Sequence, residues 1–240
     1  MLDFNPRTYH RLRLPPSEAL HAPISYRQAL FPPPTLPVGG WHGARKRTLD
    51  LAVAAGALVL LALPMLVLAL LVRLDSPGPA LFRQTRTGLD GRTFRMLKFR
   101  TMHHAAAEPD RCRQARRNDP RITRLGRWLR RTSFDELPQL FNVLRGEMSI
   151  VGPRPHAAGS RAGERLFEDV TRLYPARHRV RPGMTGLAQI RGLRGETDTE
   201  DKLLRRVHAD LEYIERWSLR LDLAIIWRTV RSLHRLPNAH

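Results

Sequence analysis

The sequence predicts an α+β, mainly helical fold in a monotopic membrane protein, with a proline-broken re-entrant membrane helix, interfacial amphipathic helices and a small β-hairpin. Three stretches carry this prediction. An uncharged apolar run extends from Leu51 to Val72, two strand patterns flank the Asp90-Gly91 turn, and residues 122–131 form a basic amphipathic stretch.

The chain is strongly basic, with 41 Lys and Arg residues against 22 Asp and Glu, giving a net charge of +19. Most of the positive charge is arginine, whose planar fork suits bidentate contact with phosphate. A charge of this size indicates an anionic partner: nucleic acid, an anionic membrane surface or a phosphorylated substrate. The single cysteine, Cys112, excludes an internal disulfide and a cysteine-cluster metal site.

Residues 1–44 are predicted to form a proline-rich, mostly disordered N-terminal tail. Prolines interrupt any long helix there, and glycines close the segment. The alternative is a regulatory or oligomerisation arm. The tail is not predicted to be a secretory signal, because it lacks an apolar core followed by a small-residue cleavage site.

Residues 45–74 are predicted to form the membrane helix. At ~1.5 Å per residue, the uncharged run would reach ~33 Å as a straight helix, enough to cross a bilayer core of ~30 Å. Pro64 favours a break within it. Positive residues flank both ends, which places both on the cytoplasmic side and favours a re-entrant hairpin broken at Pro64. A straight span and a buried helix of a soluble protein are the alternatives.

Residues 75–235 are expected to form a domain on the cytoplasmic face, beginning with a β-hairpin. Residues 81–84 and 93–100 read as strands, and Asp90-Gly91 is a favoured hairpin turn. Alternation places Lys98 and Arg100 on one strand face, where two cations could hold a pyrophosphate. A solvated sheet face is an equal alternative.

Two later stretches have helical patterns. Apolar residues at helical spacing among arginines in 122–131, with Trp128 on the apolar stripe, suit a helix lying in the membrane interface, with an ordinary surface helix as the alternative. The mostly helical 201–236 stretch is expected to present an apolar surface that includes Tyr213, Ile225 and Trp227. The polar 103–118 stretch reads as a helix or loop.

Between these helical stretches lie two adjacent carboxylates, Asp135 and Glu136, which follow a run of arginines and precede Pro138. We interpret them as the reactive centre of a membrane-bound enzyme whose cationic residues hold a polyanionic substrate. A structural alternative exists for Glu136, because Ser133 as N-cap and Glu136 at N3 would complete a capping box. Asp135 has no such alternative.

Two rigid basic loops follow the acidic pair. Prolines on both sides of Arg154 fix the backbone from which this cation projects. The stretch after Arg181 contains Pro-Gly and Thr-Gly steps that bring backbone amides close to whatever Arg181 contacts. Neither loop is a Walker loop or a Rossmann fingerprint.

Taken together, these motifs resemble the bacterial sugar transferase family, the monotopic polyprenyl-phosphate phosphoglycosyl transferases. The resemblance covers roughly residues 44–232. The matching stretches are Lys46-Arg47, Asp50, Pro64, Asp75 to Pro79, Lys98 to Met102, Asp119 to Thr123, Ser133 to Leu140, Met148 to Pro155, Arg181 to Gln189, Arg194 to Thr199 and the Tyr213 to Trp217 helix.

The resemblance implies transfer of a sugar 1-phosphate from a UDP-sugar to undecaprenyl phosphate, initiating exopolysaccharide, capsule or lipid-linked glycan synthesis. It implies that Asp135 is the nucleophile and forms an aspartyl sugar-phosphate, with UMP as the leaving group, and that Glu136 is its partner near Mg²⁺. The metal site would therefore consist of Asp135 and Glu136. Lys98, Arg100, Arg154 and Arg181 are the expected phosphate-binding residues.

The same resemblance implies a site at the cytoplasmic face of the bacterial inner membrane, in contact with its lipids, and no nucleic-acid partner. A homodimer and other polysaccharide-assembly enzymes are further partners considered. The Arg194 to Thr199 motif resembles the glucose 1-phosphate branch, whose members usually carry a four-helix membrane domain in front of the core. Glucose is therefore the first choice, with galactose and N-acetylated amino sugars behind it. A departure is Leu63, where the family often has serine before the breaking proline.

Two alternatives lie outside this family. A membrane-anchored nucleic-acid-binding protein would account for the charge, and an inert scaffold of a polysaccharide assembly complex would tolerate loss of both carboxylates. Neither gives Asp135 a role.

Overall fold

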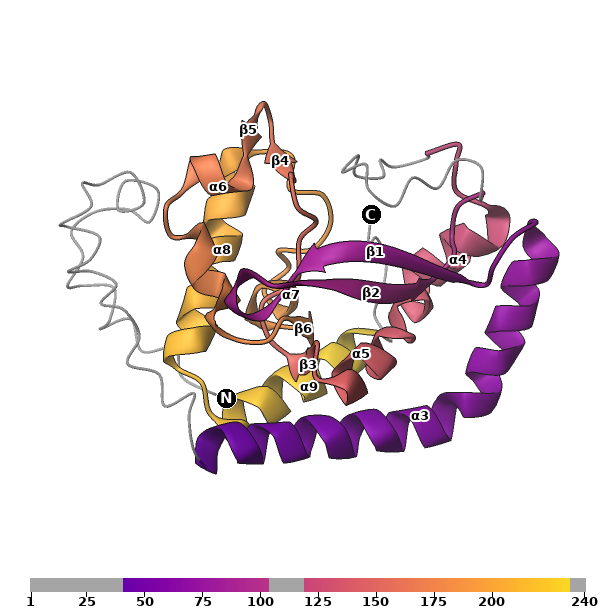
Figure 1. Ribbon diagram of the computed structural model, residues 1–240, viewed down its shortest axis with the longest axis horizontal. Helices are drawn as coiled ribbons and strands as arrows, with labels where there is room; N and C mark the ends of the chain where they lie inside the picture. Colours follow the sequence, from indigo (N-terminus) through magenta and orange to yellow (C-terminus); the bar gives the residue numbers. More distant parts are fainter. Residues whose placement is uncertain (1–40, 104–118, 234–240) are drawn as a thin grey trace.

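The computed structural model describes residues 41–103 and 119–233 (Figure 1). Residues 1–40 of the tail predicted over 1–44, and residues 104–118 of the helix or loop predicted over 103–118, lie outside this part. Residues 41–44 are helical, so the predicted tail extends four residues too far. The elements in chain order are α3 (Trp41–Asp75), β1 (Leu81–Thr87), η2 (Leu89–Gly91), β2 (Thr93–Phe99), α4 (Arg124–Thr132), η4 (Phe134–Glu136), α5 (Gln139–Arg145), β3 (Ser149–Val151), β4 (Arg161–Ala162), β5 (Arg165–Leu166), α6 (Phe167–Val170), η5 (Tyr174–Arg179), β6 (Gly183–Thr185), α7 (Leu187–Ile190), α8 (Glu200–Glu215) and α9 (Leu219–Leu233).

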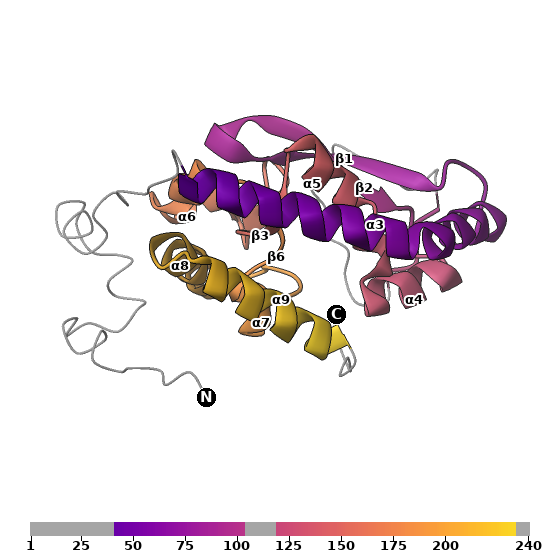
Figure 2. The same cartoon turned by 90° about the horizontal axis from the view of Figure 1, so that it is seen from below.

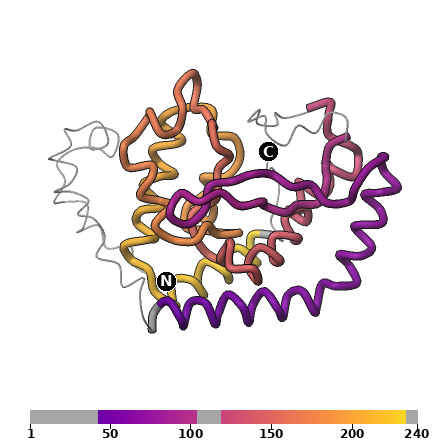
Figure 3. Tube along the Cα trace, viewed as in Figure 1, coloured from indigo at the N-terminus to yellow at the C-terminus, as the bar shows by residue number. Residues whose placement is uncertain are grey.

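Helix α3 is the one described helix that is long and apolar enough to cross a membrane, by length and composition, over Gly43–Asp75. It contains Pro64 and bends sharply along its course, which the tube in Figure 3 shows clearly. The most apolar window is only 17% buried, so α3 is not the core helix of a soluble domain and indicates association with a membrane.

Both parts of α3 nevertheless contact the rest of the protein. Ala54, before the proline, packs in the main core. Met65, Leu68 and Val72, after it, pack in a second cluster with Phe99. The helix therefore lies along the domain on both sides of Pro64, while side chains such as Val59 (82% exposed) have no protein cover.

The predicted hairpin is confirmed. Strands β1 and β2 pair antiparallel from Leu81 opposite Phe99 to Thr87 opposite Thr93. At the turn, Asp90 has φ 53° and Gly91 has φ 75°, the left-handed conformations for which an Asp-Gly pair is suited.

Two small sheets and the C-terminal helices complete the domain. Strands β3 and β6 pair parallel and β4 and β5 antiparallel, so the prediction of a mainly helical α+β fold with little sheet is confirmed. The core lies between α5, β3, α8 and α9, with Val143, Leu203 and Val207 wholly buried. Tyr213 and Ile225 belong to this core, so their prediction as surface residues is wrong: they face inward from α8 and α9.

Helix α4 confirms the predicted basic amphipathic helix, and the Thr123 hydroxyl caps it by accepting from the Gly126 amide. Seen from below, α3 runs across the protein, with α9 near its first part and α4 near its last part (Figure 2). Large exposed apolar side chains on α3, α4, α5 and α9 are Leu51, Val59, Leu60, Leu63, Leu66, Val67, Leu70, Leu71, Leu74, Trp128, Phe141, Leu144, Leu223, Trp227 and Val230.

Candidate active site

The acidic pair lies in η4, a single 3-10 turn between α4 and α5. Ser133 ends α4 in a left-handed conformation, with φ 60°, and its side chain makes no capping hydrogen bond. The predicted capping box is therefore wrong, because a left-handed Ser133 does not present its hydroxyl to the next turn. The Glu136 carboxylate instead forms ion pairs with Lys98 and Arg154.

Glu136 is held between two cations from distant segments. Lys98 Nζ on β2 lies 3.0 Å from Oε1, and Arg154 Nη1 lies 3.0 Å from Oε2. The second guanidinium nitrogen of Arg154 also donates to Oε1, which makes the pair bidentate. Burial opposes ionisation, but Arg154 and Lys98 outweigh it and hold the pKa of Glu136 well below its usual range.

Asp135 experiences the opposite balance. It is only 7% exposed, and it accepts no hydrogen bond from the residues that the structure describes. Burial raises its pKa from 3.8 to about 6; Lys98 lowers the value and Glu136 raises it. Asp135 is therefore mainly ionised at neutral pH yet poorly solvated, the state in which a carboxylate is most reactive as a nucleophile.

Two further arginines act electrostatically on this site. Arg130, on α4, donates from Nε to Thr101 Oγ1 at 2.8 Å; burial lowers its pKa, and Asp135 raises it. Burial also lowers the pKa of Arg194, with Arg154 adding to the effect and Glu136 opposing it. Sequence reasoning missed both as site cations, although Arg130 precedes Asp135 by little more than a helical turn and Arg194 opens a motif that resembled the family.

The structure brings Asp135, Glu136, Lys98 and Arg154 together, but it does not bring Arg100 to them. Buried Arg100 donates through Nη2 to the carbonyls of Val72 (3.0 Å) and Ser76 (2.6 Å), and through Nη1 to that of Pro77. Carbonyls at a helix C-terminus lack partners within the helix, and Arg100 supplies them for α3. This arrangement does not support the phosphate-binding role predicted for Arg100.

Arg181 is also engaged outside the acidic pair. It is exposed and donates from Nε to the carbonyl of Gly146 at 2.9 Å, close to the end of α5. Its predicted phosphate contact stays a prediction.

The donor set bears on the predicted metal. Across residues 41–103 and 119–233, no group of three or more His, Cys, Asp and Glu side chains could hold a metal ion. Mg²⁺ commonly takes only one or two carboxylates, with substrate phosphates and waters completing its octahedron. Both oxygens of Glu136 accept hydrogen bonds from Lys98 and Arg154, whereas Asp135 accepts none from the described residues, so Asp135 fits a metal held jointly with phosphate better than Glu136 does.

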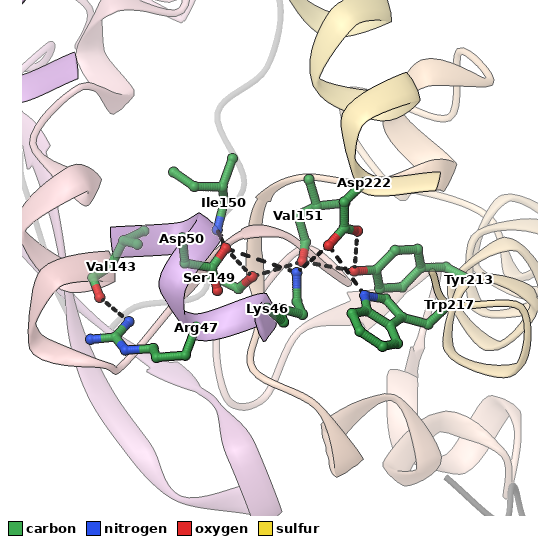
Figure 4. Close-up of polar contacts among 10 residues, drawn as sticks. All are labelled: Lys46, Arg47, Asp50, Val143, Ser149, Ile150, Val151, Tyr213, Trp217 and Asp222. Atoms are coloured by element: carbon green, nitrogen blue, oxygen red, sulfur yellow. Dashed lines mark hydrogen bonds and ion pairs between the residues drawn. The ribbon is translucent and has the colours of Figure 1, made fainter. Parts of the chain in front are cut away.

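A buried polar network fastens the N-terminal part of α3 to the domain (Figure 4). Asp50 accepts from Ser149 Oγ at 2.9 Å and from the Ile150 amide at 3.0 Å. Lys46 lies 2.8 Å from Asp222 and 3.8 Å from Asp50. The Tyr213 hydroxyl donates to Asp222 at 2.8 Å.

Comparisons with known proteins show the family to which the chain belongs. A family model described as "Bacterial sugar transferase" matches residues 41–235. The chain is 55% identical over 197 residues to "Undecaprenyl-phosphate glucose phosphotransferase" of Komagataeibacter xylinus, covering 81% of this chain and 37% of that protein. It is 54% identical over 196 residues to "UDP-glucose:undecaprenyl-phosphate glucose-1-phosphate transferase" of Caulobacter vibrioides, covering 82% and 72%.

A third relative, "Exopolysaccharide production protein PSS" of Rhizobium leguminosarum bv. phaseoli, is 51% identical over 187 residues, covering 78% of this chain and 94% of that protein. The chain thus spans well under half of the first relative's length and most of the other two.

Proposed function

We propose that this chain, which belongs to the bacterial sugar transferase family, transfers glucose 1-phosphate from UDP-glucose to undecaprenyl phosphate and releases UMP. The observation that carries the proposal is the acidic pair. Asp135 is a buried carboxylate with a raised pKa, and the neighbouring carboxylate, Glu136, is neutralised by Arg154 and Lys98. The relatives' names support glucose as the sugar. Galactose and N-acetylated amino sugars remain the alternatives.

In the first step, an Asp135 carboxylate oxygen attacks the β-phosphorus of the nucleotide sugar. The bond from that phosphorus to the bridging oxygen breaks, UMP leaves with the electron pair, and an aspartyl sugar-phosphate forms. In the second step, a phosphate oxygen of undecaprenyl phosphate attacks the same phosphorus, and the bond to Asp135 breaks. The carboxylate is regenerated, and the lipid diphosphate sugar is released.

Phosphoryl transfer needs mainly positioning and neutralisation of charge, and the residues around the pair supply both. Lys98 and Arg154 lie within 3.0 Å of Glu136 and face the same site as Asp135. Lys98 and Arg154 would contact phosphate oxygens once substrate competes with Glu136 for them, and Arg130 would add positive charge near Asp135. Glu136 keeps this positive charge in place while the site is free of substrate.

We further propose Mg²⁺ as the cofactor, with Asp135 as the better-fitting protein ligand and Glu136 as its neighbour. When bound with the substrate, the ion would neutralise the charge of the diphosphate. A metal that needs substrate phosphates to complete its shell agrees with a site that has few protein donors.

The membrane position is part of the proposal. We infer that α3 enters the cytoplasmic leaflet of the inner membrane and returns at the Pro64 bend, because both of its parts pack on the same domain. Exposed Leu63, Leu66, Trp128 and Trp227, which belong to α3, α4 and α9, would contact lipid. Asp135 would then meet the phosphate of undecaprenyl phosphate near the headgroups.

The activity is tested by following UMP release from a panel of UDP-sugars by purified protein with undecaprenyl phosphate and Mg²⁺. UDP-glucose should turn over fastest, with ping-pong kinetics, and Asp135→Asn should lower kcat by more than ~10³-fold. Asp201→Asn, which removes an exposed carboxylate paired with Arg205, is the matched control and should keep wild-type turnover. The enzyme reading fails if no UDP-sugar gives UMP, or if Asp135→Asn retains activity.

The topology has its own test. Single cysteines at Ala44 and Asp75, the two ends of α3, are introduced into a Cys112→Ser background and labelled in intact cells with a membrane-impermeant maleimide. The re-entrant helix predicts that neither is labelled until the cells are opened. Labelling of one site alone in intact cells would establish a straight span.

A further inference from the structure

Arg154 lies in a loop, residues 153–156, outside regular secondary structure. Each of the four backbone carbonyls of this loop accepts a hydrogen bond. Gly183 N donates to Pro153 O at 2.9 Å, and Thr87 N donates to His156 O at 3.2 Å. Arg86 Nη1 donates to Pro155 O at 3.4 Å. Pro153 and Pro155 offer no N–H of their own, so the loop is positioned through its acceptors.

The fourth carbonyl, that of Arg154 itself, is held by a buried charge. Arg177, in η5, is only 2% exposed and donates from Nη2 to Arg154 O at 2.8 Å. Its Nε donates to Asp210 Oδ2 on α8 at 2.7 Å, in an ion pair whose side chains are 1% and 2% exposed. One guanidinium therefore joins α8 to the residue whose own side chain pairs with Glu136.

Arg177 also fixes the residue after Pro155. Its Nη1 lies 3.1 Å from His156 Nδ1, which the Tyr174 hydroxyl also reaches at 3.0 Å. An arginine can only donate, so Nδ1 accepts and carries no proton. Burial, with Arg177 adding to it, holds the pKa of His156 well below its usual range, so the imidazole stays neutral.

We propose that the buried Arg177–Asp210 pair is a positioning unit, which sets the backbone of Arg154 so that the Arg154 guanidinium meets Glu136 beside Asp135. Arg177 is too buried to touch substrate and acts through Arg154 alone. This inference rests on the proposed function for its kinetic consequence but not for its structural one. Helix α8, through Asp210, thereby helps to position a site whose acidic pair lies on η4 and whose Lys98 lies on β2.

The principal variant removes both charges together, as Arg177→Met with Asp210→Leu, because a single replacement would leave a buried charge without its partner. Arg177→Lys is the second variant: it keeps a cation for Asp210 but loses the fork that reaches three partners. The matched control is Arg165→Met with Glu200→Leu, an exposed arginine–carboxylate pair to α8 that contacts neither His156 nor Arg154 in the described bonds.

Two readouts separate positioning from mere stability. The first is amide hydrogen exchange of the full-length protein at Thr87 and Gly183, whose N–H groups hold the loop; both variants should speed exchange there at least about tenfold, with β1–β2 pairing otherwise unchanged. The second is kcat/KM for UMP release, which should fall about ten- to hundred-fold through kcat, since small misplacements of a catalytic group cost this much.

A double-mutant cycle with Arg154→Gln completes the test. If Arg177 acts through Arg154, adding its variant to Arg154→Gln should lower kcat by less than about threefold more. Full multiplicative losses in the cycle, or unchanged exchange at Thr87 and Gly183 in both variants, would overturn the proposal. Absence of UMP release by wild type would instead refute the proposed function, and the exchange result would still decide the positioning.

Discussion

Lys46 is the cation on which the attachment of α3 depends. It lies 2.8 Å from Asp222, whose side chain is fully buried, and 3.8 Å from Asp50. Lys46→Met leaves two buried carboxylates without a cation between them. Asp222 keeps the neutral donors Tyr213 and Trp217, and Asp50 keeps Ser149 Oγ and a backbone amide, so neither becomes wholly unsatisfied.

The magnitude follows from this arrangement. Breaking a buried ion pair by removing one partner costs ~3–5 kcal/mol, and the remaining donors place Lys46→Met at about 3 kcal/mol. For a protein of this size each kcal/mol lowers the melting temperature by roughly 2–4 °C, so the expected loss is about 6–12 °C. Lys202→Met removes a lysine from an exposed pair with Asp198 and should cost less than ~1 kcal/mol.

The assay is thermal unfolding of both variants and wild type in the same detergent or nanodisc, at one scan rate, because membrane proteins unfold irreversibly. Lys46→Met should unfold first, and amide exchange should rise in α3 before it rises in β2. If Lys46→Met melts within about 2 °C of Lys202→Met, the network of Figure 4 does not hold α3 and the reasoning is refuted.

Three further predictions follow from the site and its packing. Because burial raises the pKa of Asp135 to about 6, kcat/KM should fall as the pH drops through about 6. The stability that this group contributes should depend on pH in the opposite direction: it is present below the pKa of the unfolded state and is lost as the pH rises through about 6. Melting temperatures measured across this pH range check the second effect. Arg100→Met should lower the melting temperature by several degrees, since it frees buried α3 carbonyls, while changing KM for UDP-glucose less than about twofold. Gly126→Ala should destabilise the protein strongly, because the added Cβ would lie 2.1 Å from the Thr101 carbonyl oxygen. Gly56→Ala is the control: its Cβ would meet no atom within 4 Å, so the same melting assay should show no change or a stabilisation of up to ~1 kcal/mol.

The elements that sequence reasoning predicted well are those specified by neighbouring residues. The hairpin follows from Asp90-Gly91, which supplies its left-handed turn, and α4 follows from its apolar spacing. The length of α3 follows from an uncharged run, and the break expected at Pro64 within it stays a prediction. Each of these depends on interactions within a few residues along the chain.

Partners far apart in sequence were the part that could not be predicted. Lys98 and Arg100 lie two residues apart and were assigned one task, yet Lys98 pairs with Glu136 and Arg100 with the end of α3. Ser133 fits a capping box by pattern, but α4 ends at it in the left-handed conformation, and the box is lost. The pairing of cations with anions depends on how distant elements pack together, and a local sequence pattern cannot predict that packing.

The same contacts link the acidic pair to both ends of the apolar helix. Strand β2 presents Lys98 to Glu136, and directly after this strand Arg100 holds the C-terminal carbonyls of α3. Helix α5 begins just after the pair, and Arg47 near the N-terminus of α3 donates to the Val143 carbonyl at 2.6 Å near the other end of α5. In the proposed function these two connections set the height of Asp135 above the membrane plane. A change at either end of α3 should therefore reduce the reaction with undecaprenyl phosphate more than the first release of UMP, because only the lipid acceptor is confined to that plane.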